Sequence, residues 1–147
     1  MKAAIIGAGS LGQSIAKGLL KNQVVSTLYL TKRNTNTLQS FSDCNDVILT
    51  SDNQEAIKNS DILIFAVQPK HLEKILITLQ PMLHNKHVLI SVITGFSIAK
   101  IESIVGSNTA IVRAMPNTAA AVGQSMTCIS TNTNGKEKVA LAKTIFN

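Results

Sequence analysis

A glycine-rich turn near the start of the chain limits, more than any other feature, what this sequence can fold into. Gly7, Gly9 and Gly12 form the pattern G-x-G-x-x-G, between the apolar run 3–6 and a stretch with apolar residues at helical spacing. The first glycine permits a tight turn and the third lets the helix pack closely on the strand. The second lets a phosphate approach the backbone, where the N–H groups of a helix start favour anions.

The pattern therefore predicts a strand–turn–helix unit that binds a diphosphate. The alternative is a glycine turn that serves packing alone. The predicted diphosphate-binding residues are Gly7, Ala8, Gly9, Ser10, Leu11 and Gly12.

Apolar runs alternate with helical patterns along the rest of the chain. We expect strands at 3–6, 24–31, 47–49, 62–67, 88–92, 110–115 and 126–130, and helices at 10–21, 54–59, 69–81, 98–105 and 136–146. Continuous apolar runs are typical of strands buried on both faces, and their alternation with helices indicates a parallel sheet. The sequence predicts an α/β fold in a single domain, residues 1–147, with a Rossmann-like, doubly wound, mainly parallel sheet and helices on both faces.

Composition excludes several classes of protein. Hydrophobic residues make up 45% of the chain and charged residues 15%, which suits a packed core rather than a disordered chain. No run approaches the roughly 20 apolar residues of a membrane helix. The first strand starts too early for a secretory signal to precede it. We therefore expect a cytoplasmic protein without membrane association, in which Cys44 and Cys128 are buried free thiols.

The positive charge of the chain points to a small anionic ligand. The net charge is +6, but the Lys and Arg residues are scattered, and aromatic residues make up only 3% of the chain. Few aromatic side chains leave little for base stacking, so nucleic acid is not an expected partner. A basic surface that attracts a phosphorylated or carboxylated small molecule explains the charge equally well. His84 and His87 lack a third ligand, so no metal site is expected.

The end of the second predicted strand indicates which dinucleotide would bind. Lys32, Arg33 and Asn34 stand about 20 residues after the glycine turn, where a site for NAD usually has an acid on the ribose 2′-hydroxyl. A carboxylate would repel a 2′-phosphate, whereas Lys and Arg attract one. The sequence therefore predicts NADP as the cofactor, with NADPH bound more tightly than NADH. Alternatively, the two cations only solvate a strand end.

Two further strand ends fall where a dinucleotide would continue. In open α/β sheets, ligands bind outside the carboxyl ends of the strands. Taken alone, both segments are better explained as ordinary strand-ending turns. The residues are Ala66, Val67, Gln68 and Pro69 after one strand, and Val92, Ile93, Thr94 and Gly95 after the next.

The segment 112–118, which reads V-R-A-M-P-N-T, resembles the V-R-x-M-P-N-T stretch of pyrroline-5-carboxylate reductases. The glycine pattern, the turn at 66–69, Gly95 and the pair Val122–Gly123 occur in the same order as in that family, so the resemblance covers the whole chain. It implies an oxidoreductase that transfers a hydride from NAD(P)H to the C=N bond of 1-pyrroline-5-carboxylate and so makes L-proline.

The same resemblance implies roles for individual residues. Lys32 to Asn34 would hold the adenosine phosphate, Asn53 and the two strand-end segments would line the rest of the cofactor, and Met115, Pro116 and Asn117 would face the nicotinamide and the substrate. The chain departs from the family's usual Lys, Ala, Pro and Gly at Gln68, Thr94, Ala119 and Ser125.

Members of the family carry a second, helical domain beyond the point where this chain ends. By resemblance, that domain supplies most substrate contacts, the hydroxyl that assists protonation, and the interface of a homo-oligomer. We therefore expect these 147 residues to be the cofactor-binding part only, a monomer or weak dimer that is inactive alone, with the catalytic residues elsewhere. The alternatives are the cofactor domain of another β-hydroxyacid dehydrogenase-like reductase and a non-catalytic NADP-binding module.

Overall fold

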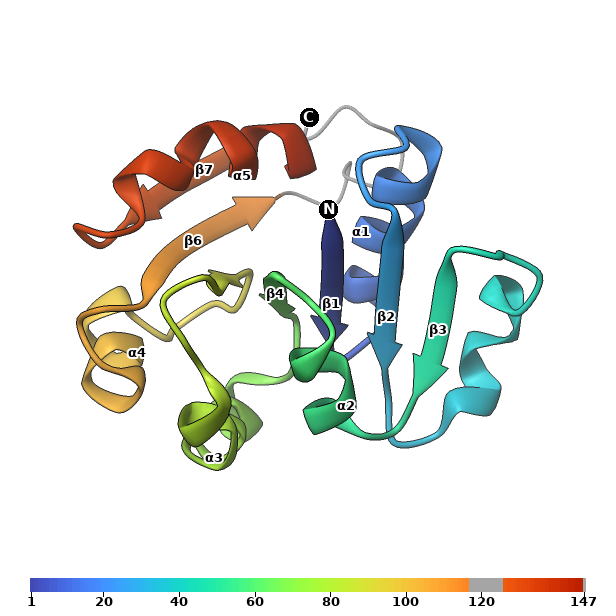
Figure 1. Ribbon diagram of the computed structural model, residues 1–147, viewed down its shortest axis with the longest axis horizontal. Helices are drawn as coiled ribbons and strands as arrows, with labels where there is room; N and C mark the ends of the chain where they lie inside the picture. Colours follow the sequence, from blue (N-terminus) through green and yellow to red (C-terminus); the bar gives the residue numbers. More distant parts are fainter. Residues whose placement is uncertain (117–125, 147) are drawn as a thin grey trace.

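The computed structural model describes residues 1–116 and 126–146, and in these ranges seven strands form one sheet (Figure 1). In chain order the elements, with 3₁₀ helices labelled η, are β1 (Lys2–Ile6), α1 (Ser10–Lys21), β2 (Thr27–Thr31), η1 (Thr35–Phe41), β3 (Val47–Thr50), α2 (Asn53–Lys58), β4 (Ile62–Phe65), α3 (Pro69–Leu79), η2 (Gln80–Met82), β5 (Val88–Ser91), α4 (Ile98–Val105), β6 (Ala110–Pro116), β7 (Thr127–Thr131), η4 (Lys136–Lys138) and α5 (Val139–Phe146).

The strand order is β3-β2-β1-β4-β5-β6-β7. Neighbouring strands from β3 to β6 are parallel, and β7 is antiparallel to β6, with Met115 opposite Cys128. The chain runs outward from β1 to β3 and then returns to β4 on the other side of β1. This reversal opens a crevice at the carboxyl ends of β1 and β4. The order confirms the predicted doubly wound sheet.

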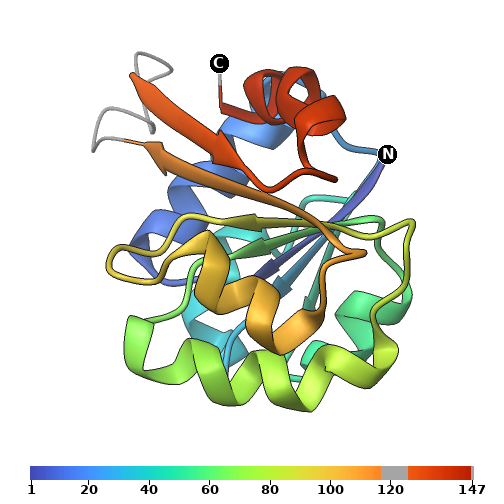
Figure 2. The ribbon, with the colours of Figure 1, turned by 90° about the vertical axis from the view of Figure 1, so that its left-hand side faces the viewer.

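Two apolar cores lie on opposite faces of the sheet (Figure 2). Helices α1 and α5 cover one face, and α2, α3 and α4 cover the other. Successive strand residues point to opposite faces, so Ile5 belongs to the first core and Ile6 to the second. Both side chains are fully buried. Burial on both faces explains why β1 is a continuous apolar run.

Several predicted boundaries are wrong. Strand β2 begins at Thr27 instead of residue 24, because Gln23 adopts a positive φ of 52° and the N–H of Val24 donates to the carbonyl of Leu19, which completes the end of α1. Strand β4 ends at Phe65, so residues 66–67 follow the strand. The helix predicted at 69–81 ends at Leu79 and continues as η2, and the one at 136–146 begins as η4. The 3₁₀ helix η1 was not predicted.

The prediction of buried thiols is also wrong. Cys44 is half-buried and Cys128 is exposed, although both are free thiols. Cys128 lies on β7, which forms one edge of the sheet, and alternate side chains of that strand face away from the cores.

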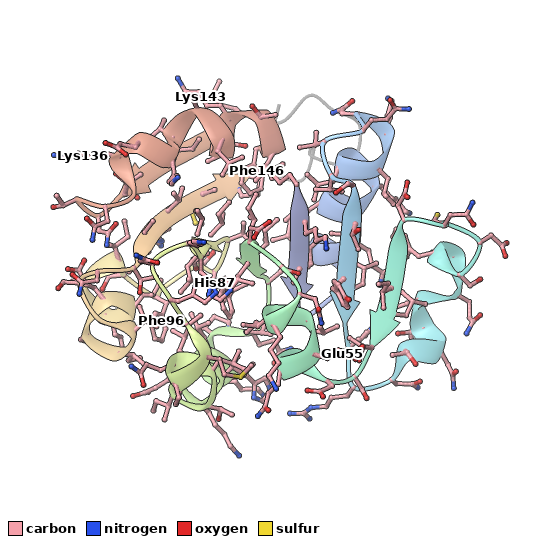
Figure 3. The ribbon with its side chains drawn as sticks, viewed as in Figure 1. Glu55, His87, Phe96, Lys136, Lys143 and Phe146 are labelled. Carbon is pink, nitrogen blue, oxygen red and sulfur yellow. The ribbon has the colours of Figure 1, made fainter. Side chains whose placement is uncertain are left out.

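His87 is a buried titratable group near the amino ends of the central strands (Figure 3). Its ring stacks on that of His84 with centroids 3.7 Å apart, and its Nδ1 accepts the backbone N–H of His84 at 3.2 Å. Burial, and then the nearby charge of His84, lowers the pKa of His87 below its ordinary value of 6.5. The buried imidazole therefore resists protonation.

We expect the free energy of unfolding to fall as the pH drops below 6.5, because the unfolded chain protonates His87 before the folded chain does. The free energy of unfolding should fall by at most about 1.4 kcal/mol per pH unit, and the fall should end below the pKa of His87 in the folded chain. Urea denaturation between pH 5 and 8 measures it. His87→Gln should remove this part of the slope, and His71→Gln should not. An unchanged slope in His87→Gln would contradict the assignment.

Candidate nucleotide-binding site

The three glycines of the turn after β1 have different surroundings. Gly7 has a φ of 89°, and a Cβ placed there would overlap the side chain of Val67. A Cβ on Gly12 would lie 2.8 Å from the carbonyl oxygen of Gly7 and 3.1 Å from Cγ2 of Ile5. Gly9 is different, since no heavy atom lies within 4 Å of its Cβ position. The tight turn at Gly7 and the close packing at Gly12 are confirmed, and the space beside Gly9 is open.

The end of β2 holds the glycine turn in place. The N–H of Ala8 donates to the carbonyl oxygen of Thr31 at 2.7 Å, and the N–H of Gly7 donates to Oγ1 of the same residue at 3.2 Å. From α1, Nε2 of Gln13 donates to the carbonyl oxygen of Ala8 at 3.1 Å. These bonds occupy the N–H groups of Gly7 and Ala8 and the carbonyl oxygen of Ala8. The N–H of Gly9 donates to the carbonyl oxygen of Gly7 at 2.9 Å, so the N–H groups open to a ligand begin at Ser10.

The opening of α1 is suited to an anion. The N–H of Gln13 makes the first helical bond, to the carbonyl oxygen of Gly9 at 2.9 Å. The N–H groups of Ser10, Leu11 and Gly12 come before it and have no acceptor within the helix. Gly9 provides no side-chain cap, and the first turn contains no acidic residue. The partial positive charge of the helix start is therefore not neutralised by a local carboxylate.

A cleft of about 460 Å³ lies at the carboxyl ends of β1, β2 and β4, beside α3. Its volume falls within the range of about 300–1,000 Å³ common for small-molecule sites. Nine of the predicted residues line it: Gly7, Gly9, Lys32, Arg33, Asn34, Asn53, Ala66, Val67 and Gln68. Segments from four different parts of the chain thus meet at the place where the strand order reverses.

Other predicted residues do not line this cleft. Ala8 and Gly12 are buried, Ser10 and Leu11 are on α1, and Pro69 begins α3.

At the carboxyl end of β5, the side chains of Val92 and Ile93 are buried in the two cores, whereas Thr94 and Gly95 are exposed. Met115 and Pro116 are half-buried at the end of β6, away from the cleft. Asn117, like Ala119 and Ser125, lies outside the described residues. Roles for these positions stay predictions.

The charges around the cleft favour a phosphate. Lys32 and Arg33 line it from the loop after β2, and Arg33 is exposed. The carboxylate of Asp52, at its edge, caps α2 by accepting the N–H of Gln54 at 2.9 Å. Glu55, on α2 (Figure 3), accepts a hydrogen bond from the hydroxyl of Thr50 at 2.8 Å and does not line the cleft. Among the cleft-lining residues that the structure describes, the charged side chains are cationic.

Sequence reasoning missed four residues of the cleft, namely Thr31, Ser51, His71 and Ile75. His71, in the first turn of α3, is half-buried and lines the cleft. One available signal was its spacing of four from Ile75, which places both residues on one face of the helix. For Thr31, the signal was a hydroxyl at the end of an otherwise apolar strand.

Comparison with known proteins assigns the chain to a family. The model of the family described as "NADP oxidoreductase coenzyme F420-dependent" matches residues 2–95, which include the glycine turn and every residue of the cleft. This chain belongs to that family. The match ends at Gly95, so it covers the first five strands of the sheet and leaves out β6 and β7.

Individual relatives match almost the whole chain. Pyrroline-5-carboxylate reductase 2 of Dictyostelium discoideum is 37% identical over 95% of this chain and 48% of its own length. A pyrroline-5-carboxylate reductase structure from Coxiella burnetii has a TM-score of 0.89 at 29% identity, covering 99% of this chain and 54% of that one. Plasmodium falciparum pyrroline carboxylate reductase, solved with NADP bound, has a TM-score of 0.86 at 27% identity, covering 100% of this chain and 54% of that one.

The resemblance to pyrroline-5-carboxylate reductases, predicted from the segment 112–118, is therefore confirmed. It covers almost the whole chain. The chain spans about half the length of each of these three proteins. No helix in the two described ranges is long and apolar enough to cross a bilayer.

Proposed function

We propose that this chain is the NADP-binding part of a pyrroline-5-carboxylate reductase, which reduces 1-pyrroline-5-carboxylate to L-proline. The observation that carries the proposal is the cleft itself: the open space at Gly9, where α1 begins, and the cation Arg33 lie around one crevice. The proposed reaction is inferred from the relatives. Their names identify them as pyrroline-5-carboxylate reductases, and one of them was solved with NADP bound.

The residues present fit an NADP molecule. The N–H groups at the opening of α1 bind its diphosphate, since anions bind at helix starts without a side-chain partner. Arg33 binds the 2′-phosphate, because a guanidinium pairs with phosphate in a bidentate manner. Val67 and Ile75 form apolar walls of the cleft. When bound, the reduced nicotinamide supplies a hydride to the C=N bond of the substrate.

In this proposal the chain binds and orients the cofactor, while residues outside it complete the reaction. Hydride transfer to an imine requires the two reacting groups within a near-attack distance and a proton for the nitrogen. The titratable residue that lines the cleft beside the cations is His71. We assign the proton donor and most substrate contacts to the half of the protein that the relatives have in addition to this region.

We expect this chain to bind NADPH about ten- to a hundredfold more tightly than NADH, because a charge-assisted phosphate contact contributes about 1.5–3 kcal/mol. Arg33→Ala should sharply reduce the difference by weakening NADPH alone. Isothermal titration calorimetry with both nucleotides measures this. Lys58→Ala is the matched control, since Lys58 is an exposed cation on α2 that does not line the cleft. Equal affinity of the unmodified chain for NADPH and NADH would refute the assignment of NADP.

A further inference from the structure

A second hollow adjoins the cleft and contains a cation that the sequence did not single out. It has a volume of about 350 Å³ and shares five residues with the cleft: Arg33, Ser51, Asn53, His71 and Ile75. Lys74 of α3 lines this second hollow, whereas Lys32 lines only the first. The two spaces therefore meet at Arg33, and each has a different lysine.

Lys74 lies on the face of α3 that is turned toward the second hollow. His71, Lys74, Ile75 and Thr78 follow the spacing i, i+3, i+4, i+7, and all four line the second hollow. The adjacent stripe of the same helix, formed by leucines such as Leu72, is buried in the core and fixes the helix on the sheet. Lys74 thus reaches the hollow from α3, whereas Arg33 reaches it from the loop after β2.

The charge of the second hollow depends on Lys74. Asp52 also lines this space, and its negative charge offsets that of Arg33. Without Lys74, these two leave the hollow neutral, which would attract a phosphate poorly. With Lys74, the hollow carries a net positive charge between two walls that belong to different elements.

We propose that Lys74, together with Arg33, binds the 2′-phosphate of NADP, and that Lys32 does not select between the two nucleotides. The inference rests on the proposed function, because it names the residues that give this cleft its preference for a phosphorylated ribose. Lys32 directly follows β2, where its backbone N–H donates to the carbonyl oxygen of Thr50 at 3.2 Å. It lines the cleft but not the second hollow. It also follows Thr31, which is hydrogen-bonded to the glycine turn, and the diphosphate proposed to bind at that turn is common to both nucleotides.

The test compares three single charge removals by calorimetric titration with NADPH and NADH. Lys74→Gln should weaken NADPH about tenfold and leave NADH unchanged, because the phosphate loses one charge-assisted contact. Lys32→Gln should change the affinities for both nucleotides by the same factor. Lys70→Gln is the matched control on α3, since Lys70 is exposed and lines neither space, and it should change neither affinity.

The outcomes separate the inference from the proposed function. If Lys74→Gln keeps the full preference for NADPH, the inference is wrong although the cofactor assignment stands. If Lys32→Gln alone abolishes the preference, the inference is also wrong. If the unmodified chain binds neither nucleotide, both the inference and the proposed function fail. Thermal unfolding of each variant checks that the fold is kept, as we expect for a substitution of the exposed Lys74.

Discussion

Gly12→Ala should lower the free energy of unfolding by about 2–3 kcal/mol, because inserting a methyl group into a filled space strains the surrounding structure. The new Cβ would lie 2.8 Å from the carbonyl oxygen of Gly7 and 3.1 Å from Cγ2 of Ile5. Neither atom can move easily, since Gly7 is in a tight turn and Ile5 is fully buried in the sheet. The helix would have to lift off β1, and that movement would also displace the N–H groups at its start.

Urea denaturation followed by circular dichroism measures the effect, and the same helix provides the control. Gly18 lies in α1, and no heavy atom is within 4 Å of its Cβ position. Gly18→Ala should therefore raise stability by about 0.5–1 kcal/mol through helix propensity alone. If Gly12→Ala were as stable as Gly18→Ala, the close contact between α1 and the glycine turn would not exist in solution.

Gly9→Ala should leave the fold intact and weaken NADPH binding by about tenfold or more, because a methyl group would hold the phosphate outside hydrogen-bond range. Gly9 has a φ of −78°, which alanine adopts without strain, and its Cβ position is free of neighbours. Loss of glycine at the helix N-cap should cost stability of under about 1 kcal/mol. Substitution of Gly12 thus tests the packing of the fold, whereas substitution of Gly9 tests cofactor binding.

Calorimetric titration of Gly9→Ala with NADPH and with NADH measures the loss. Both affinities should fall by a similar factor, since the diphosphate is common to the two nucleotides. Gly18→Ala again serves as control, and it should bind both as the unmodified chain does. Unchanged affinity in a folded Gly9→Ala protein would mean that the diphosphate does not approach the turn at this residue.

Local patterns were sufficient to predict most of the fold. The helix at 10–21 has the predicted bounds because its start is set by the glycine turn and its inner face by apolar spacing. Predictions failed where tertiary contacts decide the structure. The start of β2 depends on the positive φ of Gln23, and η1 lacks an apolar period because it buries only Leu38 and Phe41. The direction of β7 follows from pairing with β6, which no local pattern encodes.

The residues of the candidate site were likewise only partly predictable from local patterns. Arg33, Gly7 and Gly9 belong to short motifs that can be recognised in isolation, and they lie together in the cleft. Thr31, His71 and Lys74 have no motif of their own. They reach the site because β2, β1 and α3 converge at the reversal of strand order. Such convergence depends on the whole topology and is not encoded in any single segment.

Nuclear magnetic resonance of the isotopically labelled chain, titrated with NADPH, would map the proposed diphosphate-binding site at the level of single residues. The amide signals of Gly9 to Gly12 and of Arg33 should shift together and saturate at one stoichiometric equivalent, while those of β7 and α5 should stay in place. Binding without shifts at the opening of α1, or the absence of any shift, would contradict the assignment of this cleft to a dinucleotide.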